Sequence, residues 1–145
     1  MIKRILFPTD FSEHSERCIE HILNFKGCKI EEVVVLHVIN IHFNAISEIL
    51  SEEGLDKESV ISTYRKNTES ELRNVAQRFE DAGIKARMEF RIGVPFVEIN
   101  KLAEEGDVTF IVIGHRGENA AVELMLGSTA EKVARKSTKP VLLIR

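Results

Sequence analysis

The segment EEVVVLHVI, residues 31–39, carries the strongest structural signal in the chain. From Val33 to Ile39 it is almost continuously apolar and rich in β-branched residues. A half-exposed strand would alternate apolar with polar residues, whereas a strand of a parallel sheet is buried on both faces and has no polar side. The segment therefore predicts an inner strand of a parallel sheet.

Strand-like and helix-like segments alternate along the rest of the chain. Ser12 is a plausible N-cap, and Pro95 stands at a helix start. This alternation predicts a single doubly wound α/β domain over residues 1–145, with five parallel strands and helices on both faces. Residues 40–56 show a weaker pattern, which we interpret as a flap with a short helix. The expected strands lie within 2–10, 31–39, 84–92, 107–114 and 139–145, and the expected helices within 11–25, 57–83, 93–106 and 128–137.

Composition and charge exclude several classes of protein. The formal net charge of -3 argues against nucleic-acid binding, which depends on clustered Lys and Arg. No apolar run approaches the roughly 18 residues of a membrane span. The apolar run near the N-terminus, Ile5–Phe7, is too short for a signal peptide. We therefore expect a cytoplasmic protein that binds neither nucleic acid nor a membrane.

The two cysteines, Cys18 and Cys28, do not form a CxxC pair and are expected to be reduced. On a helix, Cys18 would lie near His14 and His21, which allows a metal site in principle. Cys18 also belongs to an apolar helix stripe, and a buried cysteine usually behaves as a small hydrophobic residue. We favour the buried cysteine and expect no metal ligands.

The stretch GHRGENAAVELMLGST, residues 114–129, joins a strand-like segment to a helix-like one. Gly114 and Gly117 at the strand end permit positive φ and let a ligand approach the main chain, because no Cβ stands in the way. Residues 127–129, Gly-Ser-Thr, open the helix, and the free N–H groups of a helix start favour an anion such as phosphate. A structural interpretation is equally open, in which Gly114 closes a turn and Ser128 caps the helix.

No standard nucleotide motif accompanies this stretch. The chain has neither GxGxxG nor GxxxxGK[ST]. Phosphate charge would therefore have to be balanced by backbone N–H groups, by Arg116 or by a divalent cation. Asp10 follows the first strand and would share an edge with Gly114 if strands one and four are neighbours. A carboxylate there suits ribose hydroxyls or an adenine amino group, and capping of the first helix explains Asp10 equally well.

On these residues the chain resembles the universal stress proteins, of the nucleotide-binding kind. The ATP signature of that family is Gly, two residues, Gly, nine residues, Gly and then Ser or Thr, and Gly114, Gly117, Gly127 and Ser128 follow it. The resemblance also covers ILFPTDFSEHSE, VVVLHVI, GVPFVEI and STKPVLLIR, which is nearly the whole chain. It implies the strand order 3-2-1-4-5 and a homodimer formed through the last strand, Pro140–Ile144.

The resemblance also implies an ATP site, with Mg²⁺ or Mn²⁺ as the expected cation. Asp10 would hold the ribose and adenine, and the main chain at Val38 would meet the adenine. Two positions depart from the family, since His115 stands where Ser or Thr is usual and Thr129 where Val is frequent. The residues of the expected site are Pro8, Thr9, Asp10, Val38, Ile113, Gly114, His115, Arg116, Gly117, Gly127, Ser128 and Thr129.

No catalytic set accompanies the expected ATP site. Hydrolysis needs a positioned base and a water, and the spacing of His115, Glu118 and Glu123 assigns none of them that role. We therefore expect an ATP-binding sensor or adaptor of the stress response, whose protein partners the sequence does not name. Two alternatives stay open: a slow ATPase or nucleotidyl-transferring enzyme, and a dimer that binds no nucleotide.

The substitution Gly117→Val is expected to weaken ATP binding and to leave the fold intact, because the added side chain would block a ligand without breaking a core contact. Calorimetric titration with ATP measures the affinity, and circular dichroism measures the fold. If the variant unfolds while its residual folded fraction binds ATP normally, Gly117 is a structural glycine and the prediction is wrong.

Overall fold

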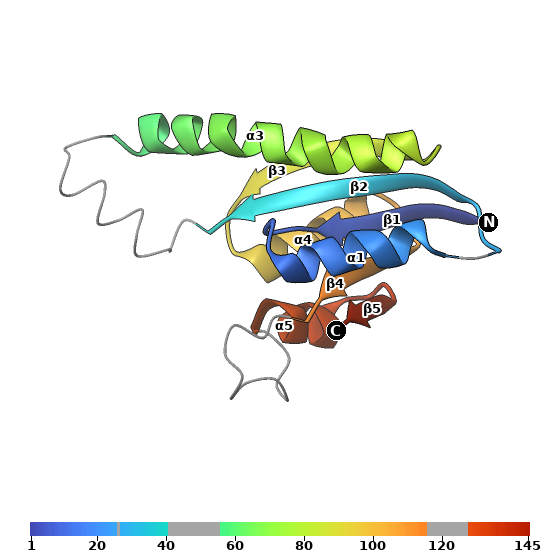
Figure 1. Ribbon diagram of the computed structural model, residues 1–145. Coiled ribbons are helices and arrows are strands. Elements are labelled where there is room, and N and C mark those ends of the chain that lie inside the picture. Colours follow the sequence, from blue (N-terminus) through green and yellow to red (C-terminus); the bar gives the residue numbers. More distant parts are fainter. Residues whose placement is uncertain (26, 41–55, 116–127) are drawn as a thin grey trace.

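The computed structural model describes residues 1–25, 27–40, 56–115 and 128–145 (Figure 1). Strands and helices alternate along these residues as the sequence predicts. The short helix expected within 40–56 falls outside the described residues, apart from positions 40 and 56 at its ends. The strands are β1 (Ile2–Pro8), β2 (Ile30–Ile39), β3 (Lys85–Ile92), β4 (Phe110–Gly114) and β5 (Val141–Ile144), and the helices are α1 (Glu13–Leu23), α3 (Lys57–Asp81), α4 (Pro95–Glu105) and α5 (Ser128–Lys136).

The five strands form one parallel sheet of order β3-β2-β1-β4-β5, which confirms the predicted fold class and strand order. β2 pairs with β1 on one side and with β3 on the other. β1 in turn pairs with β2 and with β4. The order of the strands therefore reverses direction between β1 and β4.

Helices cover both faces of the sheet (Figure 1). The run Val33–Leu36 of β2 is completely buried, because its side chains point alternately into the two layers. On the α1 and α3 side, the core contains Phe7, Cys18, Ile19, Val33, Val35, Leu72, Phe79 and Val112. On the α4 and α5 side, it contains Leu6, Val34, Leu36, Ile99, Leu102, Ile111, Ile113 and Val133.

The helix ends follow local sequence signals. Asp56 caps α3, since its Oδ1 accepts a hydrogen bond from the Ser59 N–H at 2.7 Å. The same helix ends before Gly83, whose φ of 83° continues the chain in the left-handed region. Pro95 is in the first turn of α4, where backbone N–H groups have no partner within the helix, so the N–H that proline lacks is not needed there. Within the described part of the chain, no helix combines the length and apolar character needed to cross a membrane.

β2 begins earlier than its apolar run suggests. The strand extends to Ile30 and includes Glu32, which is buried. The Nε of Arg4 donates to Oε1 of Glu32 at 2.6 Å, and the Nζ of Lys85 lies 3.7 Å from Oε2. A buried carboxylate is tolerated where cations and hydrogen bonds compensate it, so strand pairing continues past the apolar residues at the amino end of the sheet.

The two thiols are expected to differ in reactivity. Burial raises the pKa of the Cys18 thiol to about 12, and the negative charge of Asp10 adds to the rise. Only the thiolate reacts with alkylating reagents, so at a pH of about 8 the exposed Cys28 reacts while Cys18 does not. Iodoacetamide is expected to label Cys28 alone in the folded protein and both cysteines after denaturation. Peptide mass spectrometry identifies the labelled residues. Equal labelling in the folded protein would contradict the packing of α1.

Candidate functional site

The carboxyl ends of β1 and β4 lie side by side, because the sheet order makes these strands neighbours. Crossover helices run back across a parallel sheet, so α1 and α5 both begin at this edge. Thr9 and Asp10 lead from β1 into α1, Gly114 ends β4 and Ser128 opens α5. A reversal of strand order at the carboxyl edge is the usual ligand position in doubly wound sheets.

The turn that follows β1 is tightly held. Pro8 ends the strand opposite Leu36 of β2, and the N–H of the buried Thr9 donates to the Leu36 carbonyl at 2.8 Å. The Thr9 hydroxyl oxygen accepts from the N–H of Phe11 at 3.0 Å. Phe11 has a φ of 64°, a conformation that bulky residues rarely adopt. Such backbone strain persists only where the surroundings enforce it, and it clusters at functional sites.

The carboxylate of Asp10 is oriented by α1. Its Oδ1 accepts hydrogen bonds from the N–H of Ser12 and from the hydroxyl of Ser15, both at 3.0 Å. Ser12 is the N-cap residue of α1 but makes no side-chain cap bond, so Asp10 supplies the acceptor at this helix start. The N-cap of α1 is therefore Ser12 and not Asp10, so the capping interpretation of Asp10 is wrong as stated: its carboxylate accepts from the N–H of the N-cap residue and from a side chain of the first turn. Because Asp10 is also exposed, these bonds do not exclude contact with a ligand.

Gly114 serves the packing of α1. Its φ is not positive, so Gly114 does not use the left-handed conformation that glycine permits. A Cβ on Gly114 would lie 3.2 Å from the carbonyl oxygen of His14 and 3.3 Å from Sγ of Cys18. Glycine thus leaves room for the close approach of α1 to the end of β4, a contact between residues far apart in the sequence.

Three further predicted residues lie on or beside the inner strands. Val38 packs at the rim of the α4 and α5 core, and Ile113 is buried within it. His115 is also buried, and its N–H donates to the carbonyl of Ile144 at 2.7 Å. Their main chains reach the carboxyl edge of the sheet, while the aliphatic side chains face the core. A ligand at this edge would therefore meet the backbone of Val38 and Ile113.

The start of α5 is anchored by its apolar face. Ala130 and Val133 are buried, whereas Ser128 is exposed and Thr129 is half-buried. The remaining predicted residues, Arg116, Gly117 and Gly127, lie outside the described residues. Over the ranges that the structure describes, no group of three or more His, Cys, Asp or Glu side chains is arranged to hold a metal ion.

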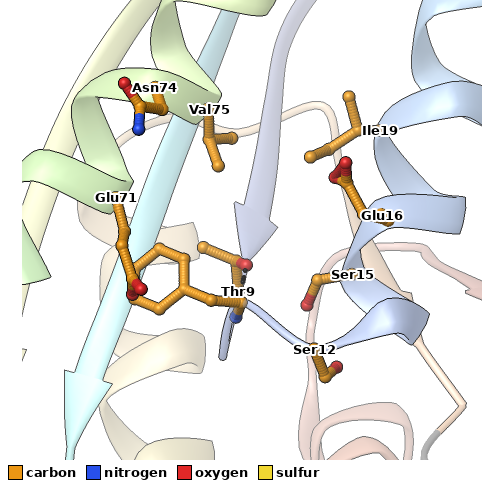
Figure 2. Close-up of a pocket in the computed structure, with 9 residues that line it drawn as sticks. Thr9, Ser12, Ser15, Glu16, Ile19, Glu71, Asn74 and Val75 are labelled. Atoms are coloured by element: carbon orange, nitrogen blue, oxygen red, sulfur yellow. Dashed lines mark hydrogen bonds between the residues drawn. The ribbon is translucent and has the colours of Figure 1, made fainter.

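A small hollow of about 180 Å³ lies between α1 and α3 beside the β1 turn (Figure 2). Thr9 lies at its base, Ser12 and Ser15 line it from the start of α1, and Glu71 lines it from α3. Glu16 also borders it and is paired with Arg78 of α3. Carboxylates around a hollow disfavour phosphate, so an anionic group is better accommodated at the start of α5.

Sequence reasoning missed His37. The residue is 6% exposed within β2, and one ring nitrogen lies 2.9 Å from the Thr9 carbonyl oxygen. The available signal was a lone polar side chain inside an otherwise apolar strand, which needs buried partners. Those partners come from the β1 turn and from Tyr64 of α3, and spacing along the chain does not reveal them.

Comparison with known proteins identifies relatives across the whole chain. A family model described as "Universal stress protein family" matches residues 1–145. Universal stress protein MJ0577 of Methanocaldococcus jannaschii is 36% identical over 100% of this chain and 96% of its own length. Universal stress protein YxiE of Bacillus subtilis is 30% identical over 100% of both chains.

Solved structures share the fold. The structure of the MJ0577 protein has a TM-score of 0.83 at 36% identity and covers 99% of this chain and 96% of that one. A universal stress protein from Archaeoglobus fulgidus in complex with dAMP has a TM-score of 0.60 at 23% identity and covers 100% of both chains. A universal stress protein in complex with cAMP has a TM-score of 0.65 at 20% identity and covers 99% of this chain and 97% of that one.

The substitution Gly114→Ala is expected to destabilise the fold by about 1–3 kcal/mol, because the added methyl group overpacks the contact with α1. Urea unfolding measures the loss. The double variant Gly114→Ala/Cys18→Ala is expected to lose less stability than the sum of the losses in the two single variants. The reason is that the Cys18 sulfur, 3.3 Å from the added Cβ, is absent in the double variant. Unchanged stability would refute the packing role of Gly114.

Proposed function

Since this chain belongs to the universal stress protein family, we propose that it binds ATP with Mg²⁺ or Mn²⁺ and acts as a nucleotide-dependent sensor or adaptor in the stress response. The proposed site lies at the carboxyl edge between β1 and β4. It comprises Pro8, Thr9, Asp10, Val38, Ile113, Gly114, His115, Arg116, Gly117, Gly127, Ser128 and Thr129.

One observation carries the proposal: a strained turn with an oriented carboxylate lies at the reversal of strand order. Asp10 is held by Ser12 and Ser15, and α5 opens with Ser128 at the same edge. A fixed carboxylate accepts hydrogen bonds from ribose hydroxyls without the entropy cost of ordering a mobile side chain. The start of α5 offers N–H donors and a positive dipole end to the phosphates. The two groups thus suit opposite ends of one nucleotide.

The ligands of related structures support an adenine nucleotide. The dAMP and cAMP complexes involve proteins that are 23% and 20% identical to this chain, a level that establishes the fold alone. Both ligands contain adenine, a ribose-type sugar and a phosphate. The glycine spacing at Gly114, Gly117 and Gly127 supports the choice of ATP among adenine nucleotides.

A homodimer through β5 is part of the proposal. β5 pairs with β4 and forms an edge of the sheet. Its Leu142 is 37% exposed, which is high for a leucine in a strand. Among the described strands β5 pairs with β4 alone, and an edge strand with an exposed apolar side chain favours pairing with a second copy of itself.

Calorimetric titration of ATP with Mg²⁺ into the wild-type protein and into Asp10→Asn tests the site. Asparagine keeps an acceptor for Ser12 and Ser15 but loses the charge, so we expect binding to weaken about tenfold while the turn is retained. Asp107→Asn is the matched control, because Asp107 precedes β4 at the opposite edge and pairs with Lys3. It should bind ATP like the wild type.

The same titrations discriminate the alternatives. No heat of ATP binding by the wild type would refute the proposal in favour of a dimer that binds no nucleotide. If Asp10→Asn and Asp107→Asn weaken ATP binding equally, Asp10 has no specific role in the site. Chromatography of the same mixtures detects any ADP or AMP that is formed. Steady release of either product would favour the slow enzyme over the sensor.

A further inference from the structure

His37 is placed where β2 meets the turn that carries Asp10. Its neighbours Leu36 and Val38 pack toward the α4 and α5 side, and its own ring lies on the opposite face of the sheet, under α3. There it packs against three aromatic rings, with centroid distances of 4.8 Å to Phe11, 5.9 Å to Tyr64 and 6.0 Å to Phe90.

The hydrogen bonds of His37 determine which nitrogen of its neutral ring carries the proton. Nδ1 lies 2.9 Å from the carbonyl oxygen of Thr9, which can only accept, so Nδ1 carries a proton and donates it. In the neutral ring, Nε2 then accepts from the hydroxyl of Tyr64 at 3.3 Å. Burial raises the pKa of Tyr64, with further contributions from Glu71 and Asp10, so this hydroxyl keeps its proton. The imidazole thus joins the β1 turn to α3 by two directional contacts.

The two residues that flank Asp10, Thr9 and Phe11, both contact the imidazole ring of His37. On one side, the Thr9 carbonyl accepts from Nδ1. On the other, the Phe11 ring lies against the imidazole with an interplanar angle of 31°, which helps to hold the left-handed backbone of Phe11. His37 thus contacts both residues that flank Asp10 in the chain.

We propose that His37 is a positioning residue of the nucleotide site: it fixes the Thr9–Asp10–Phe11 turn and couples that turn to α3 through Tyr64. This inference rests on the proposed function, because it assigns His37 a role at that same site. A histidine that only filled the core would stabilise the fold without setting the position of the turn. These two roles of His37 predict different behaviour of the turn in the protein without ligand and different ATP affinities of the variants.

Four variants separate the contacts of His37. His37→Leu removes both hydrogen bonds at similar volume, and His37→Asn keeps a donor close to the position of Nδ1. Tyr64→Phe removes only the bond to Nε2. Phe90→Leu is the matched control, because it changes ring packing on His37 and leaves both hydrogen bonds intact.

The first measurement uses the protein without nucleotide. In ¹H–¹⁵N spectra, the amide signals of Asp10, Phe11 and Ser12 are expected to move in His37→Leu, to return toward their wild-type positions in His37→Asn, and to stay unchanged in Phe90→Leu. If these signals move equally in His37→Leu and Phe90→Leu, His37 is only a core residue and the inference is overturned.

The second measurement is ATP binding. We expect His37→Leu to weaken it about tenfold, with at least partial rescue by His37→Asn and with wild-type affinity in Phe90→Leu. Should His37→Leu fail to fold, the comparison of His37→Asn and Tyr64→Phe with Phe90→Leu decides the same question. Wild-type affinity in every folded His37 and Tyr64 variant would overturn the inference.

The third measurement follows Tyr64, which is the only tyrosine of a chain without tryptophan. Its fluorescence, corrected for absorption by the nucleotide, is expected to change on ATP binding in the wild type and to stay constant in His37→Leu. A constant signal in the wild type that binds ATP would overturn the coupling to α3. Absence of ATP binding by the wild type would refute the proposed function, whereas the amide signals still decide whether His37 positions the turn.

Discussion

The burial of β2 from both sides is the constraint on which the rest of the structure depends. Val33–Leu36 expose no surface, so apolar layers must cover both faces of the sheet. A chain that supplies such layers between parallel strands has to cross back after each strand, and each crossover helix then starts at the carboxyl edge. The starts of α1 and α5 and the exit from β1 meet at one edge for this reason. The proposed site is thus a product of how the core is covered.

The sequence predicts most of this fold because its signals are local. Apolar runs, Pro95 and the glycine after α3 mark elements whose bounds agree with the structure within a few residues. The strand order came from family resemblance, since periodicity does not say which strands pair. The packing role of Gly114 and the partners of His37 escaped prediction, because they depend on contacts across α1 and α3. Long-range contacts leave little trace in residue spacing.

Asp10 combines a structural role at the start of α1 with a place in the proposed site. Its Oδ1 ties Ser12 and Ser15 to the turn, which stabilises the start of α1. The same bonds restrict the carboxylate to one orientation, which is the condition for a preorganised ligand contact. The hydrogen bonds of Asp10 at the helix start are therefore compatible with the ligand contact that we propose for it.

The left-handed backbone of Phe11 has a consequence for the choice of amino acid at this position. Glycine would adopt a φ of 64° without steric penalty, but it would remove the ring that lies against His37. An aromatic residue keeps that contact at a conformational cost on the order of 1–3 kcal/mol. Position 11 is thus subject to a trade-off between backbone strain and ring packing. Relief of the strained backbone favours glycine, whereas the contacts of the phenyl ring with His37 and with the core under α1 and α3 favour the aromatic residue.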